Sequence, residues 1–315
     1  MSGRVVLLVT SPRLPAGVLT AQAWDLVRAH PVLTAEESEQ TETLRAAGAA
    51  VTVVPATADT LLAAIAEHGT VVWLAAPEGD EHLARELGLR LAREPGLAEL
   101  ELLYGSWDPP GARLLDVVTV MDRLMHPDSG DPWKRAQTHT SLAPFLLEEA
   151  YELYDAIRDD DTEAVREELG DVLLQVALHA RLAEETASFT IDDVAGDLVA
   201  KLIRRNPHVF AGTEVADIDE IIANWEQIKK TEKSRASAAD GVALSQPALS
   251  LTAKLLQRVE RAGLTVPTPP ADTLGGELFA LAARARAEGE DAEAALRKAA
   301  LDYIESIRTA ERRSA

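Results

Sequence analysis

The chain has 315 residues, of which 47% are hydrophobic, so it is long enough for about two domains with apolar cores. Its 52 acidic residues exceed its 31 Lys and Arg residues, and the resulting net charge of -21 excludes a general affinity for nucleic acids or anionic membranes. The absence of cysteine excludes disulfides and thiolate metal sites, and no apolar run approaches the roughly 20 residues of a membrane span, so we expect a cytoplasmic protein.

Residues 1–105 alternate short β-branched runs with helical patterns. This alternation predicts a small α/β domain with a mainly parallel sheet. Neither GxGxxG nor GxxxxGK[ST] occurs in it, so the familiar nucleotide cradles are absent and the role of this domain stays open. The predicted strands are Val5–Val9, Val51–Val54 and Val71–Leu74, and the predicted helices are Thr20–Ala29, Glu42–Ala47 and Thr57–Glu67, the last with Thr57 as its N-cap.

A turn-rich linker, Gly105–Gly111, separates this region from a predominantly helical one over residues 112–235. Its helices include 191–205, which Pro207 should stop, and 218–233. Four or five helices with short loops predict a bundle, in which facing helices can build a site directed inward.

Two acidic clusters lie at helical spacing within this bundle. Glu149 and Glu152 share one helix face, and Glu168 and Asp171 share another. The run Asp159–Asp161, followed by Thr162 as a plausible N-cap, predicts the turn of an antiparallel hairpin. Four carboxylates would then meet, and oxygen ligands suit a hard cation such as Mg²⁺.

The C-terminal region, residues 247–315, follows a connector predicted over Ser234–Pro247. It is expected to be helical over 249–262 and 273–313. Thr273–Arg286 aligns with Glu168–Arg181 at Leu, Gly, Leu, Ala, Ala and Arg, which suggests a degenerate repeat. Its counterparts of Glu168 and Asp171 are Thr273 and Gly276, so this repeat would be structural.

The pattern Glu148-Glu149-x-x-Glu152 followed by Glu168-x-x-Asp171 resembles the EExxE…ExxD signature of the MazG family of all-α nucleoside triphosphate pyrophosphohydrolases. Four further sequence blocks resemble blocks of the family and occur in the same order along the chain. They are LDVVTVMDRLM from Leu115, DPWKRAQT from Asp131, NPHVF from Asn206 and WEQIK from Trp225. The resemblance implies that the helical region is an all-α MazG-type bundle, while residues 1–105 lie outside it. Together with the patterns above, the expectation is a multidomain protein with a small α/β domain, this bundle and a degenerate C-terminal helical repeat.

The same resemblance implies cleavage of ribo- or deoxyribonucleoside triphosphates to nucleoside monophosphate and pyrophosphate, with Mg²⁺ or Mn²⁺ as cofactor. The implied metal ligands are Glu149, Glu152, Glu168 and Asp171. Glu148 would orient water as a base beside Glu149 and Glu152.

The resemblance also implies residues on the substrate side of the site. The family places a Lys and an Arg near phosphate, and Lys201 and Arg205 stand at that block on one helix face. Where the family reads CPWD, this chain has Asp131-Pro132-Trp133-Lys134, which leaves the role of that loop open. The complete set of expected substrate contacts is Trp133, Gln137, Lys201, Arg205, Trp225 and Lys229.

Several alternatives remain open. In so acidic a chain the carboxylates alone could form a solvated helix face, Lys201 and Arg205 could be ion-pair partners, and Trp225 could be a core residue. His139 and His179 are interpreted as structural. The expected function is removal of unwanted nucleotides by a homodimer, whereas the alternatives are a related enzyme for another phosphorylated nucleotide and a non-catalytic, partner-binding helical protein.

Overall fold

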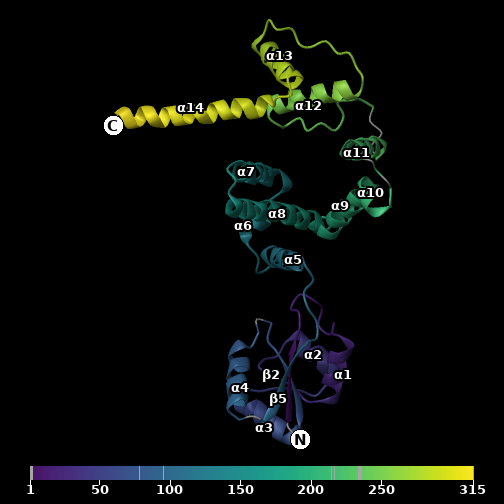
Figure 1. Ribbon diagram of the computed structural model, residues 1–315, viewed down its shortest axis with the longest axis vertical. Helices are drawn as coiled ribbons and strands as arrows, with labels where there is room; N and C mark the ends of the chain where they lie inside the picture. The colour runs from purple at the N-terminus through teal and green to yellow at the C-terminus, as the bar shows by residue number, and fades with distance from the viewer. Residues whose placement is uncertain are drawn as a thin grey trace. The chain divides into compact units, whose positions relative to one another are not determined.

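The computed structural model describes residues 3–77, 79–94, 96–213, 215, 217–232 and 236–314. The chain divides into two compact units, Met1–Asp197 and Leu198–Ala315, with the division inside helix α9 (Ile191–Arg205). The first unit contains a parallel sheet with its helices, followed by further helices, and the described part of the second unit is helical (Figure 1). None of the described helices combines the length and apolar character that a membrane span requires.

A five-stranded sheet with the order β3-β2-β4-β1-β5 forms the centre of the N-terminal region, and the pairings among its described strands are parallel, as predicted. Successive side chains of a strand face opposite sides of the sheet. Val5 therefore packs in the core beneath α3 and α4, whereas Val6 packs beneath α1 and α2. The bounds are β1 Gly3–Val9, α1 Ala21–Ala29, β2 Val32–Thr34, α2 Glu39–Ala46, β3 Val51–Val53, α3 Ala58–His68, β4 Thr70–Leu74, α4 Glu81–Arg93 and β5 Ala98–Tyr104.

Three of these elements, β2, α4 and β5, have no counterpart among the predicted ones. Strand β2 has only 3 residues, too few to show a period. Strand β5 reads AELELLY and lies at the sheet edge, where one neighbour, β1, supplies its pairing. Helix α2 also begins earlier than predicted, because Ser38 and Thr41 form a capping box there. The predicted cap of α3 is confirmed, since Thr57 Oγ1 accepts a hydrogen bond from the Thr60 N–H at 3.2 Å.

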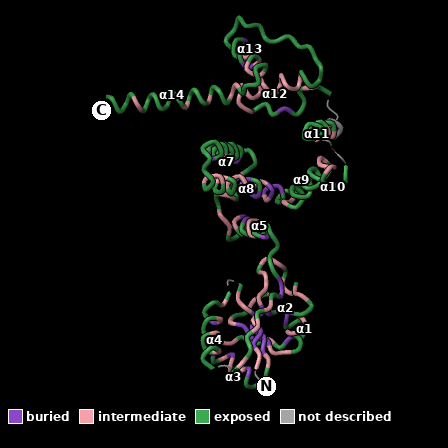
Figure 2. The backbone as a smooth tube through the Cα atoms, in the orientation of Figure 1, coloured by how far each residue is buried: buried purple, intermediate pink, exposed green. Residues whose placement is uncertain are grey.

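Helices α7 and α8 form the central hairpin of the helical region, and α5 packs against α8. The shared core contains Met121 and Met125 from the α5 end, Leu142 from α7, and Leu178 and Leu182 from α8. Figure 2 shows buried segments in the sheet and along α8. This core lies away from the loop that joins the two helices, so the acidic residues near the loop remain accessible. The bounds are α5 Arg113–Leu124, α6 Pro132–Arg135, α7 His139–Arg158 and α8 Thr162–Glu185.

The turn between α7 and α8 falls at the predicted acidic run. Asp160 has a φ of 56°, a left-handed conformation that Asp tolerates better than most residues. The expectation that Thr162 caps α8 is wrong, because Asp161 is the N-cap. The Asp161 Oδ1 atom accepts hydrogen bonds from the N–H groups of Glu163 and Ala164, both at 3.1 Å, and thereby satisfies two donors of the first turn.

The second unit contains the end of α9, α10 (Pro207–Phe210), α11 (Ile218–Glu232), α12 (Ala248–Arg261), α13 (Leu274–Ala287) and α14 (Ala292–Ser314). The single helix predicted over 273–313 is wrong. Gly289 has a φ of 79° and ends α13, while Asp291 accepts hydrogen bonds from the N–H groups of Glu293 and Ala294 and starts α14. Residues 233–235, where the end of the 218–233 helix and the start of the connector were predicted, lie outside the described residues, and residues 236–247 of the predicted connector form turns and irregular structure.

We expect the core of the hairpin to be sensitive to truncation at Leu142, which is only 1% exposed. Leu142→Ala should lower the free energy of unfolding by about 2–5 kcal/mol, because it leaves a cavity between α5, α7 and α8. Chemical denaturation followed by circular dichroism would measure this change. Leu114→Ala, at a leucine of α5 that is 55% exposed, is the control and should have a much smaller effect. Equal losses in the two variants would contradict the assigned core.

Candidate active site

Three carboxylates gather where α7 and α8 face each other near their connecting loop. Each of Glu149, Glu152 and Glu168 offers an oxygen atom, and these atoms lie within 4.8 Å of one another. Glu149 and Glu152 are three residues apart on α7 and therefore share a face, while Glu168 comes from α8. Glu149 and Glu168 are partly buried, and Glu152 is exposed. The cluster is thus open to a ligand and has the oxygen donors that a hard divalent cation prefers.

The electrostatics of this cluster oppose full ionisation. Partial burial, followed by the negative charge of Asp171 and contact with Glu152, raises the pKa of Glu149 above its usual range. Partial burial and the charges of Glu152 and Asp171 raise the pKa of Glu168 in the same way. Both shifts arise because a carboxylate is less stable as an anion when it is desolvated and surrounded by like charges. A cation at this position would remove the repulsion.

Asp171 and Glu148 lie beside the cluster rather than within it. Asp171 is three residues after Glu168 on α8, and its charge acts on both Glu149 and Glu168. It does not belong to the group of oxygens within 4.8 Å of one another. Glu148 is exposed and adds its charge to the environment of Glu149. All five predicted acids therefore occupy one region of the hairpin, with three in mutual reach.

The loop that departs from the family block forms the short helix α6. Asp131 caps this helix by accepting a hydrogen bond from the Trp133 N–H at 2.8 Å, which lowers the pKa of Asp131, and Lys134 contacts the same carboxylate at 3.2 Å. Trp133 is 52% exposed and packs edge-on against Phe145. The Gln137 amide donates to the Trp133 carbonyl at 2.9 Å. The difference between Asp131-Pro132-Trp133-Lys134 and the CPWD of the family thus has a structural effect, because Asp131 and Lys134 form an ion pair with each other.

Three of the remaining predicted substrate residues, Arg205, Trp225 and Lys229, form a cationic cluster in the second unit. The Arg205 guanidinium lies 5.4 Å from the ring centre of Trp225, and the Lys229 ammonium lies 4.6 Å from it. Lys201 is exposed on α9, four residues before Arg205. Arg205 also forms an ion pair with Glu232, so the alternative that it has a carboxylate partner is correct. The partly buried Trp225 ring holds two cations rather than filling a core.

Two participants in this cluster, Arg204 and Glu232, were not among the predicted residues. Glu232 is seven residues after Trp225 and three after Lys229, so the helical period of α11 already places these residues on one face. In a chain with 52 acidic residues, however, this spacing alone does not single out Glu232.

His139 and His179, predicted to be structural, contact each other across α7 and α8. Their Nδ1 atoms are 2.7 Å apart, and their rings are stacked with centres 5.0 Å apart. Burial, with a smaller effect of His139, lowers the pKa of His179, which favours the neutral ring. One ring therefore donates a hydrogen bond to the other, and the pair ties the start of α7 to α8.

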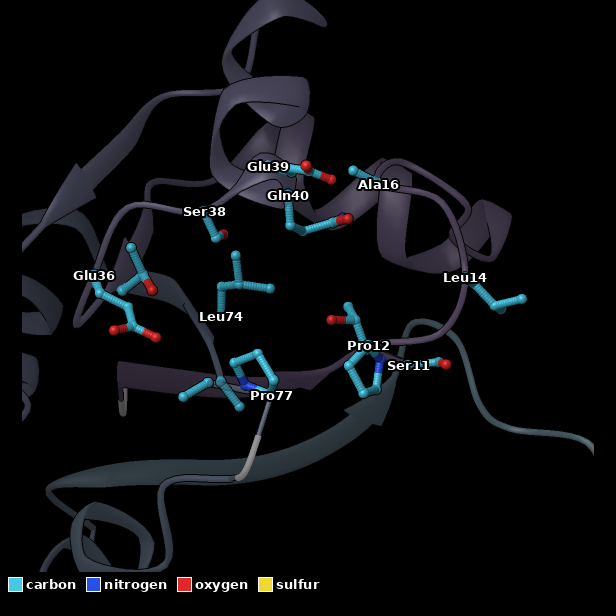
Figure 3. A pocket seen from close by; sticks show the side chains of 14 residues that line it. Ser11, Pro12, Leu14, Ala16, Glu36, Ser38, Glu39, Gln40, Leu74 and Pro77 are labelled. Carbon is cyan, nitrogen blue, oxygen red and sulfur yellow. The ribbon is translucent and has the colours of Figure 1, made fainter. Parts of the chain in front are cut away.

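A separate pocket of about 170 Å³ lies at the carboxyl ends of β1, β2 and β4. Gln40 and Leu74 lie opposite Pro12 across this pocket (Figure 3). The Gln40 Nε2 atom is buried without a hydrogen-bond partner among the described residues. Glu36 and Glu39 are among the lining residues, so the local charge disfavours a phosphate-bearing ligand.

Comparison with known proteins places the helical region in a family. The sequence model of the MazG nucleotide pyrophosphohydrolase domain matches residues 137–210, which include all the acids of the cluster. An uncharacterised 26.1 kDa protein of Streptomyces cacaoi is 48% identical over 233 residues, which are 73% of this chain and 94% of that protein.

Several relatives carry the name nucleoside triphosphate pyrophosphohydrolase, among them proteins of Mycobacterium tuberculosis and Escherichia coli. The Mycobacterium tuberculosis protein is 46% identical over 204 residues, covering 64% of this chain but only 59% of its own length. The Escherichia coli K12 protein is 35% identical over 226 residues, covering 62% of this chain and 86% of its own length. The chain therefore belongs to the MazG family of nucleoside triphosphate pyrophosphohydrolases, which are hydrolases acting on phosphoanhydride bonds.

Proposed function

We propose that this protein hydrolyses ribo- or deoxyribonucleoside triphosphates to the nucleoside monophosphate and pyrophosphate, with Mg²⁺ or Mn²⁺ as cofactor. The observation that carries this proposal is the group of three carboxylates, Glu149, Glu152 and Glu168, with oxygens within 4.8 Å of one another. Membership of the MazG family supports the same reaction class.

The residues of the cluster fit a divalent cation. Glu149, Glu152 and Glu168 supply carboxylate oxygens, and Asp171 adds a nearby negative charge that acts on two of them. The pKa values of Glu149 and Glu168 are raised by partial burial and by neighbouring negative charges, whose repulsion an opposite charge would offset. A bound Mg²⁺ would supply that charge, offset the negative charge of the phosphates and lower the pKa of water.

The protein residues would then have separate roles in the reaction. Water forms a bond to the α phosphorus, the anhydride bond between the α and β phosphates breaks, and pyrophosphate leaves with the bonding electron pair. Glu148, which is exposed beside the cluster, would orient the water and accept its proton. The proposed substrate contacts are Lys201, Arg205 and Lys229 for phosphate, Trp225 for the nucleoside, and Trp133 and Gln137 in the α6 region.

The same proposal covers the physiological setting. A pyrophosphohydrolase of this kind would act as a homodimer on the cytoplasmic nucleotide pool and remove unwanted nucleotides from it. Exposed apolar side chains along α7, including Leu147, Tyr154 and Ile157, support a dimer, because such a face is stabilised when it is covered.

Removal of one acid should stabilise the metal-free protein. Glu149→Gln removes one of the repelling charges, so we expect a higher unfolding temperature than that of the wild type in EDTA. Folding raises the pKa of Glu149, so protonation of this side chain favours the folded wild-type protein. That contribution to stability is lost as the pH rises through the pKa of the folded state. The advantage of the variant should therefore grow with pH and vanish in acid.

Thermal unfolding across a pH series, with EDTA and with Mg²⁺, would measure this effect. Mg²⁺ should raise the unfolding temperature of the wild type more than that of the variant, since a ligand stabilises the state that binds it. A variant less stable than the wild type at every pH in EDTA would contradict the repulsion.

The reaction itself is tested by pyrophosphate release from nucleoside triphosphates in the presence of Mg²⁺. Asp171→Asn and Glu152→Gln should each lower kcat/KM by about 100-fold or more, since even outer-shell changes at metal sites cost about 10–100-fold. Glu163→Gln is the matched control, because Glu163 is an exposed acid of the same helix α8 that lies outside the cluster. Release of orthophosphate by the wild type, or activity that persists in EDTA, would contradict the proposal.

A substrate panel separates this function from that of a related enzyme. We expect nucleoside triphosphates to give the highest kcat/KM, because the cationic cluster offers several positive groups to a long phosphate chain. Phosphoribosyl-ATP should be the poorer substrate, measured by the same pyrophosphate assay. A strong preference for phosphoribosyl-ATP would assign the chain to another substrate class, and nucleotide binding without turnover would favour a non-catalytic role.

A further inference from the structure

Glu232, the last described residue of α11, holds two arginines of α9 at once. Its Oε1 atom accepts hydrogen bonds from Arg204 Nε at 2.8 Å and from Arg205 Nε at 3.1 Å. Its Oε2 atom accepts from Arg205 Nε at 3.1 Å and also contacts Arg205 Nη2. The contact with Arg205 is therefore two-pronged, the geometry in which a guanidinium and a carboxylate fix each other's orientation.

This ion pair is more enclosed than an ordinary surface pair. The side chains of Glu232 and Arg205 are 11% and 16% exposed, whereas that of Arg204 is 53% exposed. The hydrogen bonds from Arg205, followed by those from Arg204, lower the pKa of Glu232 to about 2. Glu232 therefore stays ionised at neutral pH, and the arrangement persists under the conditions in which an enzyme works.

Trp225 restrains the same guanidinium from a second direction. Arg205 lies over its ring at 5.4 Å, and Lys229 lies near the ring at 4.6 Å, so the indole and the carboxylate together restrict the guanidinium plane. Glu232 occupies the Nε and Nη2 side of Arg205, and the Nη1 side takes no part in this ion pair. Two arginines therefore share the Glu232 carboxylate, and Lys229 lies near the same indole ring.

We propose that Glu232 is a positioning residue, which holds Arg204 and Arg205 in the orientation that receives the phosphate chain of the substrate. This inference deepens the proposed function and rests on it. Arginine side chains lose rotamer freedom when they bind a ligand, and a side chain that is already held loses less. Glu232 thereby improves phosphate binding although it carries the same charge sign as the phosphates.

The test compares Glu232→Gln, Glu232→Asp and the wild type as full-length proteins. Calorimetric titration with inorganic triphosphate in EDTA measures phosphate binding alone, and nucleotide hydrolysis with Mg²⁺ gives KM and kcat. We expect Glu232→Gln to raise both the Kd for triphosphate and KM by about tenfold, as for the loss of a charged hydrogen bond. The value of kcat should stay within about twofold, since chemistry does not involve this residue.

Two further variants make the result specific. Glu232→Asp keeps the carboxylate and should restore most of the binding, and it provides the decisive comparison if Glu232→Gln does not fold. Asp219→Asn removes one charge from the exposed start of α11 and should leave Kd and KM unchanged. Circular dichroism and thermal unfolding would establish that each variant is folded.

Other results would contradict the positioning role of Glu232 or the proposed function. A Kd for triphosphate that is unchanged or lower in folded Glu232→Gln would overturn the proposal, and a lower value would show that Glu232 competes with phosphate. Failure of the wild type to bind triphosphate in EDTA would overturn it as well. Wild-type protein that binds triphosphate in a Glu232-dependent way but releases no pyrophosphate would refute the proposed function and leave the positioning role intact.

Discussion

Repulsion among carboxylates is the constraint on which the helical region depends. Glu149, Glu152 and Glu168 bring oxygens within 4.8 Å of one another, and partial burial together with neighbouring negative charges raises the pKa values of Glu149 and Glu168. The opposing stabilisation comes from the apolar core at the other end of the hairpin, around Leu142 and Leu178. The core and the acids lie at different positions along the same two helices. The core can therefore stabilise the hairpin while the acids remain available to bind a cation.

The second unit faces the reverse problem, because cations must stay available within a chain of net charge -21. In the described part of this unit, two arginines share one carboxylate, and one of them and a lysine also lie near an aromatic ring. Arg205 is held between Glu232 and Trp225, while Arg204 remains half exposed. An Arg paired one-to-one with an acid would lose most of its attraction for phosphate, whereas here two arginines share one carboxylate, which holds them in a defined geometry.

Differences between the predicted and observed elements have local physical causes. Strand β2 is too short for a period to be visible, and the break at Gly289 is brief, since only Glu288–Asp291 separate α13 from α14. At the start of α8, Thr162 and Asp161 are both good caps, and the choice falls to Asp161 because Asp160 takes the left-handed conformation that reverses the chain. The degenerate C-terminal repeat stays a prediction, since α12, α13 and α14 pack together without any test of its origin.

The sequence by itself determined the helical hairpin, the acids that meet across it and the family to which the chain belongs. It could do so because residues three or four apart necessarily share a helix face, and a short acidic turn folds the two helices onto each other. Only the tertiary structure decided that three of the acids are in mutual reach and that Glu232 holds Arg204 and Arg205. Each of these contacts joins residues on different helices, where several acids of equal charge could serve as partners. Helical periodicity specifies the face on which a side chain lies, but not which side chain of a facing helix it contacts.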